Sequence, residues 1–233
     1  MLIGIYDYTV ILTYFSLLSA GTGIVVSLSG SGHPYLGVFF LLICGLCDAF
    51  DGKVAGTKKN RTDLERNFGI QIDSLSDIVA FGVLPACIGA SLMRLSPFLN
   101  EISEPNKENP FASLISFVLF GALIFYILAA LIRLAYFNVT EEERQKVETG
   151  SRKTYTGLPV TAASLIFPAV MLLQYVIPAD LTLLYFAAVL FTGFAFLANF
   201  QIRKPGLRGI LIMVGIGLVE FVLMLIFRLV LKH

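Results

Sequence analysis

Charged residues are scarce in this chain of 233 residues, because Asp, Glu, Lys and Arg make up only 14% of it, against 57% for hydrophobic residues. A soluble domain usually carries about a quarter charged residues. The deficit comes with long uncharged runs, and runs of about 18 or more apolar residues are typical of membrane spans. The chain is too short for several spans plus a soluble domain of ordinary size. We therefore expect a single membrane-embedded domain, residues 1–233.

Several other signals are missing. The net charge is +1, and no basic stripe with interleaved aromatic residues occurs, so we expect no nucleic-acid partner. Cys44 and Cys47 form a C-x-x-C pair, but no second pair completes a zinc site, and with Cys87 they are expected to be buried small hydrophobic residues. The N-terminus lacks the positive region and cleavage site of a signal peptide. No internal repeat or low-complexity tract is visible.

Seven near-continuous apolar segments are predicted to span the membrane, because each is long enough to cross about 30 Å of hydrocarbon. They are residues 9–30, 35–55, 69–93, 111–137, 158–178, 180–200 and 207–231. Helices are expected, since an open sheet cannot satisfy its backbone in lipid. The predicted fold class is therefore all-α, a polytopic membrane helical bundle.

The basic residues are distributed unevenly between the two sides of this predicted bundle. Twelve Lys and Arg residues lie in the segments after spans two, four and six, against four on the other side. Cytoplasmic loops carry the excess of Lys and Arg. We therefore place the N-terminus and these three segments in the cytoplasm, in a multi-pass protein.

Four carboxylates lie inside predicted spans, where an ionised side chain is costly. Asp48 and Asp51 are near the end of span two, and Asp73 and Asp77 are at a similar depth in span three. The spacings i,i+3 and i,i+4 put each pair on one helical face. A solvated helix end would tolerate such acids, but two same-face pairs favour a divalent cation. Carboxylate ligands favour Mg²⁺, Mn²⁺ or Ca²⁺ over Zn²⁺.

The residues around these acids resemble a family signature. Asp48-Ala-Phe-Asp51-Gly52-Lys-Val-Ala55, followed by Gly69-Ile-Gln-Ile-Asp73-Ser-Leu-Ser-Asp77, is similar to the D-x-x-D-G-x-x-A-R … G-x-x-x-D-x-x-x-D pattern of the CDP-alcohol phosphotransferases. The resemblance implies a six-helix membrane core, about residues 9–200, and usually a homodimer. The metal site would face the cytoplasm, and the span at about 207–231 would be an addition.

Two departures from the signature bear on the charge near the site. Gly56 stands where the family has an arginine, and the spacer has twelve residues instead of eight. The resemblance implies that this arginine helps to hold charge near the nucleotide-lipid. A nearby cation would have to replace it, and the candidates are Lys53, Lys58, Lys59 and Arg61.

A second layer of resemblance points to the phosphatidylserine synthase branch of this family. It lies in FGIQIDSLSDIVAFGVLPA, in RLAYFNV (133–139) and in YTGLPVTAA (155–163). It implies transfer of a phosphatidyl group from CDP-diacylglycerol to L-serine, which gives phosphatidylserine and CMP, in the plasma membrane. Asp48, Asp51 and Asp73 would hold one or two Mg²⁺ or Mn²⁺ ions, or Ca²⁺, and Asp77 would bind metal and act as the general base.

Substrate-binding residues are expected around the aspartates. The cytidine is expected along the small face at Gly52 and Ala55, and the CDP-lipid set is Gly52, Lys53, Ala55, Gly69, Thr13 and Ser16. Ordinary helix-to-helix hydrogen bonds are the alternative for Thr13 and Ser16.

Serine also carries a carboxylate, which needs a cation. Arg133 lies well inside span four, where an arginine is a functional candidate, although snorkelling to the headgroups is an alternative. Asn138 and Lys153 are weaker candidates for the same substrate.

Two other functions remain open. A sister enzyme would use glycerol-3-phosphate or inositol as the acceptor. An ion-coupled transporter would also place acids in the membrane, but usually near the midplane and with repeats. Glu220, in the last span, has no assigned role.

Overall fold

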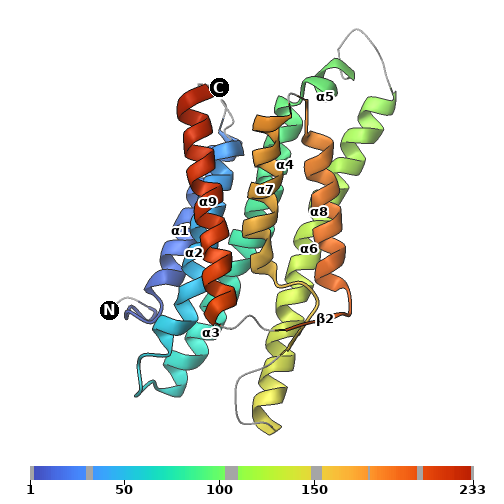
Figure 1. The fold of residues 1–233 in the computed structure, drawn as a ribbon. Coiled ribbons are helices and arrows are strands. Elements are labelled where there is room, and N and C mark those ends of the chain that lie inside the picture. Colours follow the sequence, from blue (N-terminus) through green and yellow to red (C-terminus); the bar gives the residue numbers. More distant parts are fainter. Residues whose placement is uncertain are drawn as a thin grey trace.

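Seven long helical segments run side by side in the computed structural model, which describes residues 3–29, 34–102, 110–147, 154–177, 179–203 and 207–231 (Figure 1). The elements in chain order are α1 (Ile11–Leu28), α2 (Pro34–Ala55), α3 (Asp63–Asp77), the π-helix η1 (Ile78–Val83), α4 (Leu84–Leu95), α5 (Pro97–Ile102), α6 (Pro110–Val147), β1 (Thr154–Thr156), the 3₁₀ helix η2 (Val160–Ala162), α7 (Ala163–Val176), α8 (Thr182–Leu197), β2 (Gln201–Arg203) and α9 (Leu207–Leu231). The predicted all-α bundle is confirmed.

Five of these segments are long and apolar enough to cross a membrane, which makes the chain a multi-pass membrane protein. They are Ile11–Leu28, Pro34–Ala55, Asp63–Leu95, Ser113–Val147 and Arg208–Ile226. The prediction was wrong on the length of the other two. The helices α7 and α8 have 14 and 16 residues, fewer than the roughly 20 that a span needs.

The shortening of α7 has a local cause. The first residues of predicted span five, 158–162, are not part of α7, because Pro159 is extended and Val160–Ala162 form the 3₁₀ helix η2. Just before them, β1 pairs antiparallel with β2, so that Tyr155 is opposite Ile202. Gly157 then turns the chain with φ +74, and a Cβ there would lie 2.9 Å from the carbonyl oxygen of Phe196. Only glycine fits this turn. The small sheet corrects the expectation that helix is the sole element.

The first two helices are held together by small side chains. The buried face of α1 consists of Thr13, Ser16, Ser19, Ala20, Gly23 and Ser27. A Cβ at Gly23 would lie 2.9 Å from the Cβ of Phe40 in α2. Small residues let helices approach closely, which is how association is achieved where lipid offers no hydrophobic driving force.

The third segment starts with a capping box and changes register halfway. Thr62 accepts a hydrogen bond from the backbone of Glu65, whose side chain accepts one from the backbone of Thr62. After Asp77 the chain forms the π-helix η1. Pro85 has no N–H to donate to the carbonyl of Phe81, and the hydroxyl of Tyr126 donates to that oxygen at 2.6 Å. The π-turn therefore packs against α6.

The last helix packs against α7 and α2. The ring of Phe221 stacks on that of Phe39, with their centroids 4.0 Å apart. Glu220 is buried in α9, and its Oε2 has no hydrogen-bond partner within the described residues.

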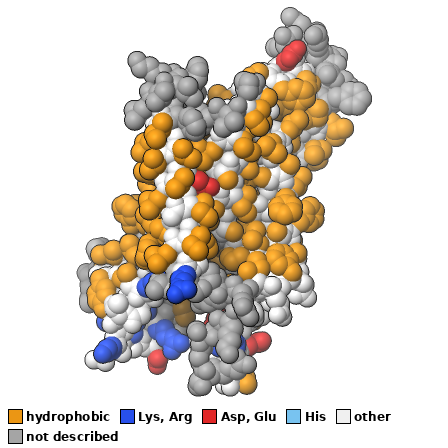
Figure 2. Space-filling model, in the orientation of Figure 1, with side chains coloured by type: hydrophobic (Ala, Val, Ile, Leu, Met, Phe, Trp, Pro, Cys, Tyr) orange, Lys and Arg blue, Asp and Glu red, His pale blue; other side chains and the backbone are white. Residues whose placement is uncertain are grey.

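The two ends of the bundle differ in their surface. Hydrophobic side chains cover the middle of the molecule, whereas Lys and Arg gather at the lower end, near α3 and the described N-terminal segment (Figure 2). Such a hydrophobic girdle with charges at an end is expected of a protein surrounded by lipid.

Candidate active site

Three aspartates from two antiparallel helices meet at one end of the bundle, here called the aspartate end. Carboxylate oxygens of Asp48, in α2, and of Asp73 and Asp77, in α3, all lie within 4.8 Å of one another. Two oxygens that share a hard cation, each 2.0–2.6 Å from it, lie within about 5 Å of each other. The residues thus fit a divalent cation, and three of the four aspartates predicted to converge do so.

The fourth aspartate sits beside this trio. Asp51 accepts a hydrogen bond from the N–H of Gly52, and its carboxyl approaches that of Asp73. Asp51 is not a member of the three-residue group within the described part of the chain. The acid pair of α2 is therefore divided, with Asp48 in the cluster and Asp51 at its edge.

Neighbouring helices fix the orientation of α3. The hydroxyl of Ser76 donates to the carbonyl of Thr13 at 3.3 Å, and the amide of Asn138 donates to the hydroxyl of Ser74 at 2.7 Å. Both serines lie between Asp73 and Asp77 in the sequence, so these contacts fix the part of α3 that carries the two aspartates against α1 and α6.

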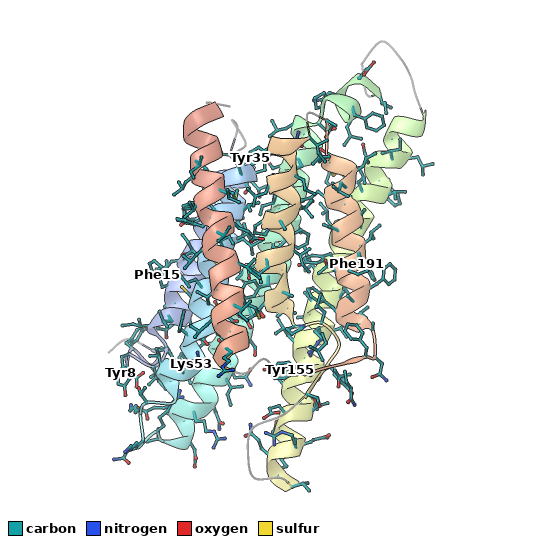
Figure 3. All side chains as sticks on the ribbon, in the orientation of Figure 1. Tyr8, Phe15, Tyr35, Lys53, Tyr155 and Phe191 are labelled. Carbon is teal, nitrogen blue, oxygen red and sulfur yellow. The ribbon has the colours of Figure 1, made fainter. Side chains whose placement is uncertain are left out.

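A cavity of about 790 Å³ opens beside the aspartates. All four aspartates line it, together with Gly52, Lys53, Arg133, Tyr155, Ser164 and apolar residues of α2, α7 and α9. Lys53 and Tyr155 lie at the same end of the bundle, opposite Tyr35 (Figure 3). The ammonium group of Lys53 also lies 5.2 Å from the ring centre of Phe50.

Arg133 is buried in α6 and held in place. Its Nε donates to the carbonyl of Leu158 at 3.1 Å, and its guanidinium lies 5.6 Å from the ring centre of Phe137. An arginine that snorkels would be exposed, so the snorkelling alternative is wrong for Arg133. Its side chain lines the cavity that the aspartates share.

Other predicted substrate residues do not line the cavity. Thr13 and Ser16 are buried in the interface of α1, where the backbone oxygen of Ser16 accepts from the thiol of Cys44 at 3.3 Å. Neither hydroxyl is thus part of the cavity lining, and the Oγ of Ser16 has no hydrogen-bond partner within the described residues. Asn138 bridges α6 and α3, and Ala55 ends α2 away from the cavity lining. Lys153 lies outside the described residues.

The long basic spacer is tied to its surroundings. Lys58 forms 2.7 Å ion pairs with Asp7 and Glu65, and hydrogen bonds from Lys58 and Thr9 lower the pKa of Asp7 to about 2. The guanidinium of Arg61 lies where a Cβ of Gly69 would be, 2.6 Å from it. Lys58 and Arg61 are thus engaged elsewhere, and Lys53 is the spacer-side cation that reaches the cavity.

Some cavity residues were missed by the sequence analysis. Tyr155 and Ser164 were not singled out, although the YTGLPVTAA segment that contains Tyr155 was noted for its resemblance. Ser164 packs against Gly45 of α2, and neither carries a local signal of function. The contribution of α9 was also missed, because its uniform apolar sequence marks no inward face.

A membrane-embedded helical bundle with an acidic cluster beside a deep, largely apolar cavity defines an enzyme class that works at a lipid–water boundary. The family model for CDP-alcohol phosphatidyltransferases matches residues 9–218. The chain belongs to this family, whose members use a divalent metal.

Curated relatives narrow the comparison. The chain is 33% identical over 157 residues to the CDP-diacylglycerol–serine O-phosphatidyltransferase of Saccharomyces cerevisiae, covering 66% of this chain and 48% of that protein. It is 33% identical over 150 residues to the archaetidylserine synthase of Methanothermobacter thermautotrophicus, covering 64% and 52%. It is 26% identical over 222 residues to the CDP-diacylglycerol–serine O-phosphatidyltransferase of Helicobacter pylori, covering 91% and 77%. The chain spans about half the length of the first two relatives.

Proposed function

We propose that this protein transfers a phosphatidyl group from CDP-diacylglycerol to the hydroxyl of L-serine, giving phosphatidylserine and CMP. The observation that carries the proposal is the three-aspartate cluster at the mouth of a cavity that continues between apolar helices. One such cavity accommodates a charged diphosphate and an apolar tail. The activities for which the relatives are named, serine phosphatidyl transfer for two and archaetidylserine synthesis for one, support serine as the acceptor.

Asp48, Asp73 and Asp77 would hold the divalent cation, with Asp51 completing the set from the edge. Mg²⁺ or Mn²⁺ suits these hard oxygen ligands, and Ca²⁺ is a further ion that they would accept, one ion or two. The cation supplies charge neutralisation for the diphosphate and for the departing CMP. Without one, three converging half-buried carboxylates would repel one another.

Asp77 is the proposed general base. Its carboxylate accepts the proton of the serine hydroxyl as the serine oxygen forms a bond to the lipid-side phosphorus. The bond from that phosphorus to the CMP oxygen breaks, and its electron pair leaves with CMP. Holding donor and acceptor in line is the main contribution of the residues around the cavity.

Arg133 is the proposed partner of the serine carboxylate. Its buried guanidinium is fixed by Leu158 and Phe137 and lines the cavity. A fixed planar guanidinium suits a carboxylate, which it can bind through two parallel hydrogen bonds. Lys53 and Gly52 line the cavity and remain the proposed donor-side residues, and Lys53 would supply the positive charge that Gly56 lacks. Gly69 does not line the cavity, because the guanidinium of Arg61 lies against it.

The setting of the enzyme is also part of the proposal. The excess of Lys and Arg in the segments at the aspartate end supports a cytoplasmic location for this end, with the bundle in the plasma membrane. The chain would act as a single domain, with a core at about 9–200 and α9 as the addition, in a homodimer.

An acceptor panel tests the reaction. The purified protein in mixed micelles with CDP-diacylglycerol and Mg²⁺ is expected to release CMP only when L-serine is added. Incorporation of glycerol-3-phosphate or inositol, and not of serine, would assign a sister activity. An ion-coupled transporter would release no CMP with any acceptor.

A matched pair of variants tests the base. Asp77→Asn is expected to lower kcat at least about 100-fold, within the range that general bases contribute. Asp63→Asn removes an exposed carboxylate from the first turn of the same helix and serves as the control. Equal activity of the two variants would exclude Asp77 as the base.

A further inference from the structure

The cavity beside the aspartates has a second, apolar part to which α9 supplies one wall. Six residues of this helix line it: Ile210, Met213, Val214, Gly217, Leu218 and Phe221. Their spacing of three and four residues keeps them near one helical face. From Ile210 to Phe221 the helix rises by about 16 Å. The apolar part is therefore an elongated groove between α9 and the helices α2 and α7.

The groove ends at a pair of aromatic rings. Phe221 is the cavity-lining residue of α9 closest to its C-terminus, and its ring stacks on that of Phe39 at 4.0 Å. Phe39 lies about one turn before Leu42, the first cavity-lining residue of α2. Because α2 and α9 run in opposite directions, this pair closes the groove at the end farthest from Asp51 and Lys53.

The side of the groove is open to the molecular surface. Leu46, Met213 and Leu218 line the cavity and are nevertheless 41%, 37% and 52% exposed. They belong to α2 and α9, in the hydrophobic part of the bundle that would face lipid. A hydrocarbon chain would thus enter sideways without crossing a polar surface.

Gly217 sets the width of the groove. A Cβ at this position would lie 3.5 Å from Cδ2 of Leu165 and 3.8 Å from Cδ2 of Leu42, and both leucines line the cavity. A methyl group would make ordinary contacts there, whereas a larger side chain would extend between the two leucines. A Cβ at Gly215, two residues earlier, would meet nothing within 4 Å.

We infer that α9 forms the wall of a groove for one acyl chain of the lipid donor, and that Gly217 and Phe221 select its length. This inference rests on the proposed function, because a donor whose diphosphate lies at the aspartates carries its apolar tails next to them. The groove is continuous with the aspartate site, apolar, and long enough for on the order of twelve carbon–carbon bonds of an extended chain. Neither a nucleotide nor serine has an apolar part of this length.

The test measures donor binding as a function of chain length. CDP-diacylglycerols from dihexanoyl to dipalmitoyl are titrated into the purified full chain, and the dissociation constants are compared. Each methylene that loses its place in the groove lowers affinity by about fourfold. In Gly217→Leu we therefore expect the long-chain to short-chain affinity ratio to fall at least about tenfold, while dihexanoyl donor still binds and so reports a folded site.

Two further variants keep the inference falsifiable. Gly215→Leu adds the same side chain to the same helix and is expected to keep the wild-type ratio. Phe221→Ala opens the closed end and is expected to shift the preferred length upward, in the opposite direction from Gly217→Leu. A chain-length profile of Gly217→Leu parallel to that of Gly215→Leu would overturn the inference.

Serine-dependent CMP release, measured on the same samples, separates this inference from the proposed function. If chain-length selection changes as expected but serine releases no CMP, the assignment of the acyl groove is supported and the proposed serine reaction is refuted. If CMP is released with serine but no variant alters chain-length selection, the proposed reaction is supported and α9 does not form the wall of an acyl-chain groove.

Discussion

Replacing Gly45 by alanine is expected to push α2 and α7 apart next to the aspartates. A Cβ at Gly45 would lie 2.5 Å from the Cβ of Ser164. Carbon atoms in favourable contact are about 3.5 Å apart, so the two helices would have to separate by about 1 Å at this point. Rotating the Ser164 hydroxyl does not help, because the clash also involves its Cβ, and rotation would break its 2.7 Å bond to the carbonyl of Thr161.

The magnitude follows from the cost of overpacking. Such a clash typically costs about 1–3 kcal/mol, which lowers the melting temperature by roughly 2–12 °C in a chain of this size. Asp48 is three residues from Gly45, so its carboxylate would move with α2. A displacement of about 1 Å in an active site can lower activity about 100-fold. We expect both losses, read by circular dichroism melting and by serine-dependent CMP release.

Two controls make the result decisive. Gly121→Ala, on α6, adds a Cβ that meets nothing within 4 Å and reports the gain of about 1 kcal/mol that alanine brings to a helix. The double variant Gly45→Ala with Ser164→Gly removes the clashing atoms and is expected to recover most of both losses. If Gly45→Ala behaves like Gly121→Ala, or if Ser164→Gly gives no rescue, the reasoning about this helix crossing is refuted.

Three further outcomes are expected. Gly56→Arg should tighten CDP-diacylglycerol binding by up to about fivefold, since an added cation at an exposed position contributes about 1 kcal/mol at most. Unchanged affinity in a titration would mean that Lys53 already supplies the positive charge that the lipid donor needs. Arg133→Lys should raise the KM for serine about tenfold and that for the lipid donor less, because lysine cannot bind a carboxylate in bidentate fashion; equal increases would assign Arg133 to folding. The pKa of Asp7 is lowered to about 2 by hydrogen bonds from Lys58 and Thr9, so its stabilising contribution is complete above the ordinary value of 3.8 and is lost as the pH falls towards 2. The hydrogen-exchange protection factors of residues 3–10, which are corrected for the intrinsic pH dependence of exchange, should fall over this range in the wild type but change little in Asp7→Asn.

The arrangement of the four aspartates was predicted in part from the local sequence pattern. The i,i+3 and i,i+4 spacings and the basic spacer predicted two antiparallel helices with acids at one depth, and Asp48, Asp73 and Asp77 do converge. Helical periodicity is a property of adjacent residues, so the sequence alone determined it. It did not distinguish Asp48 from Asp51, because their separation depends on how α2 is rotated against α3.

The roles of single buried polar residues could not be predicted from the local sequence pattern. Arg133 and Thr13 both appeared as polar residues in apolar helices, with a functional and a packing interpretation for each. Arg133 lines the cavity, whereas Thr13 is buried outside the cavity lining and only its backbone carbonyl accepts a hydrogen bond from Ser76 of α3. The two cases differ only in which neighbour lies opposite, and that neighbour is distant in the sequence.

The sequence by itself determined that the chain is a multi-pass helical membrane protein with an acidic site made by its second and third long helices. Composition and periodicity suffice for this, because lipid forces each apolar segment to satisfy its own backbone. Only the tertiary structure decided the π-turn after Asp77, the β1–β2 pairing that precedes η2 and α7, and the position of α9 against the cavity. Each of these depends on contacts between distant segments, such as the bond from Tyr126 to Phe81 and the stacking of Phe221 on Phe39. An apolar helix such as α9 carries no mark of its inward face, so packing alone selects it.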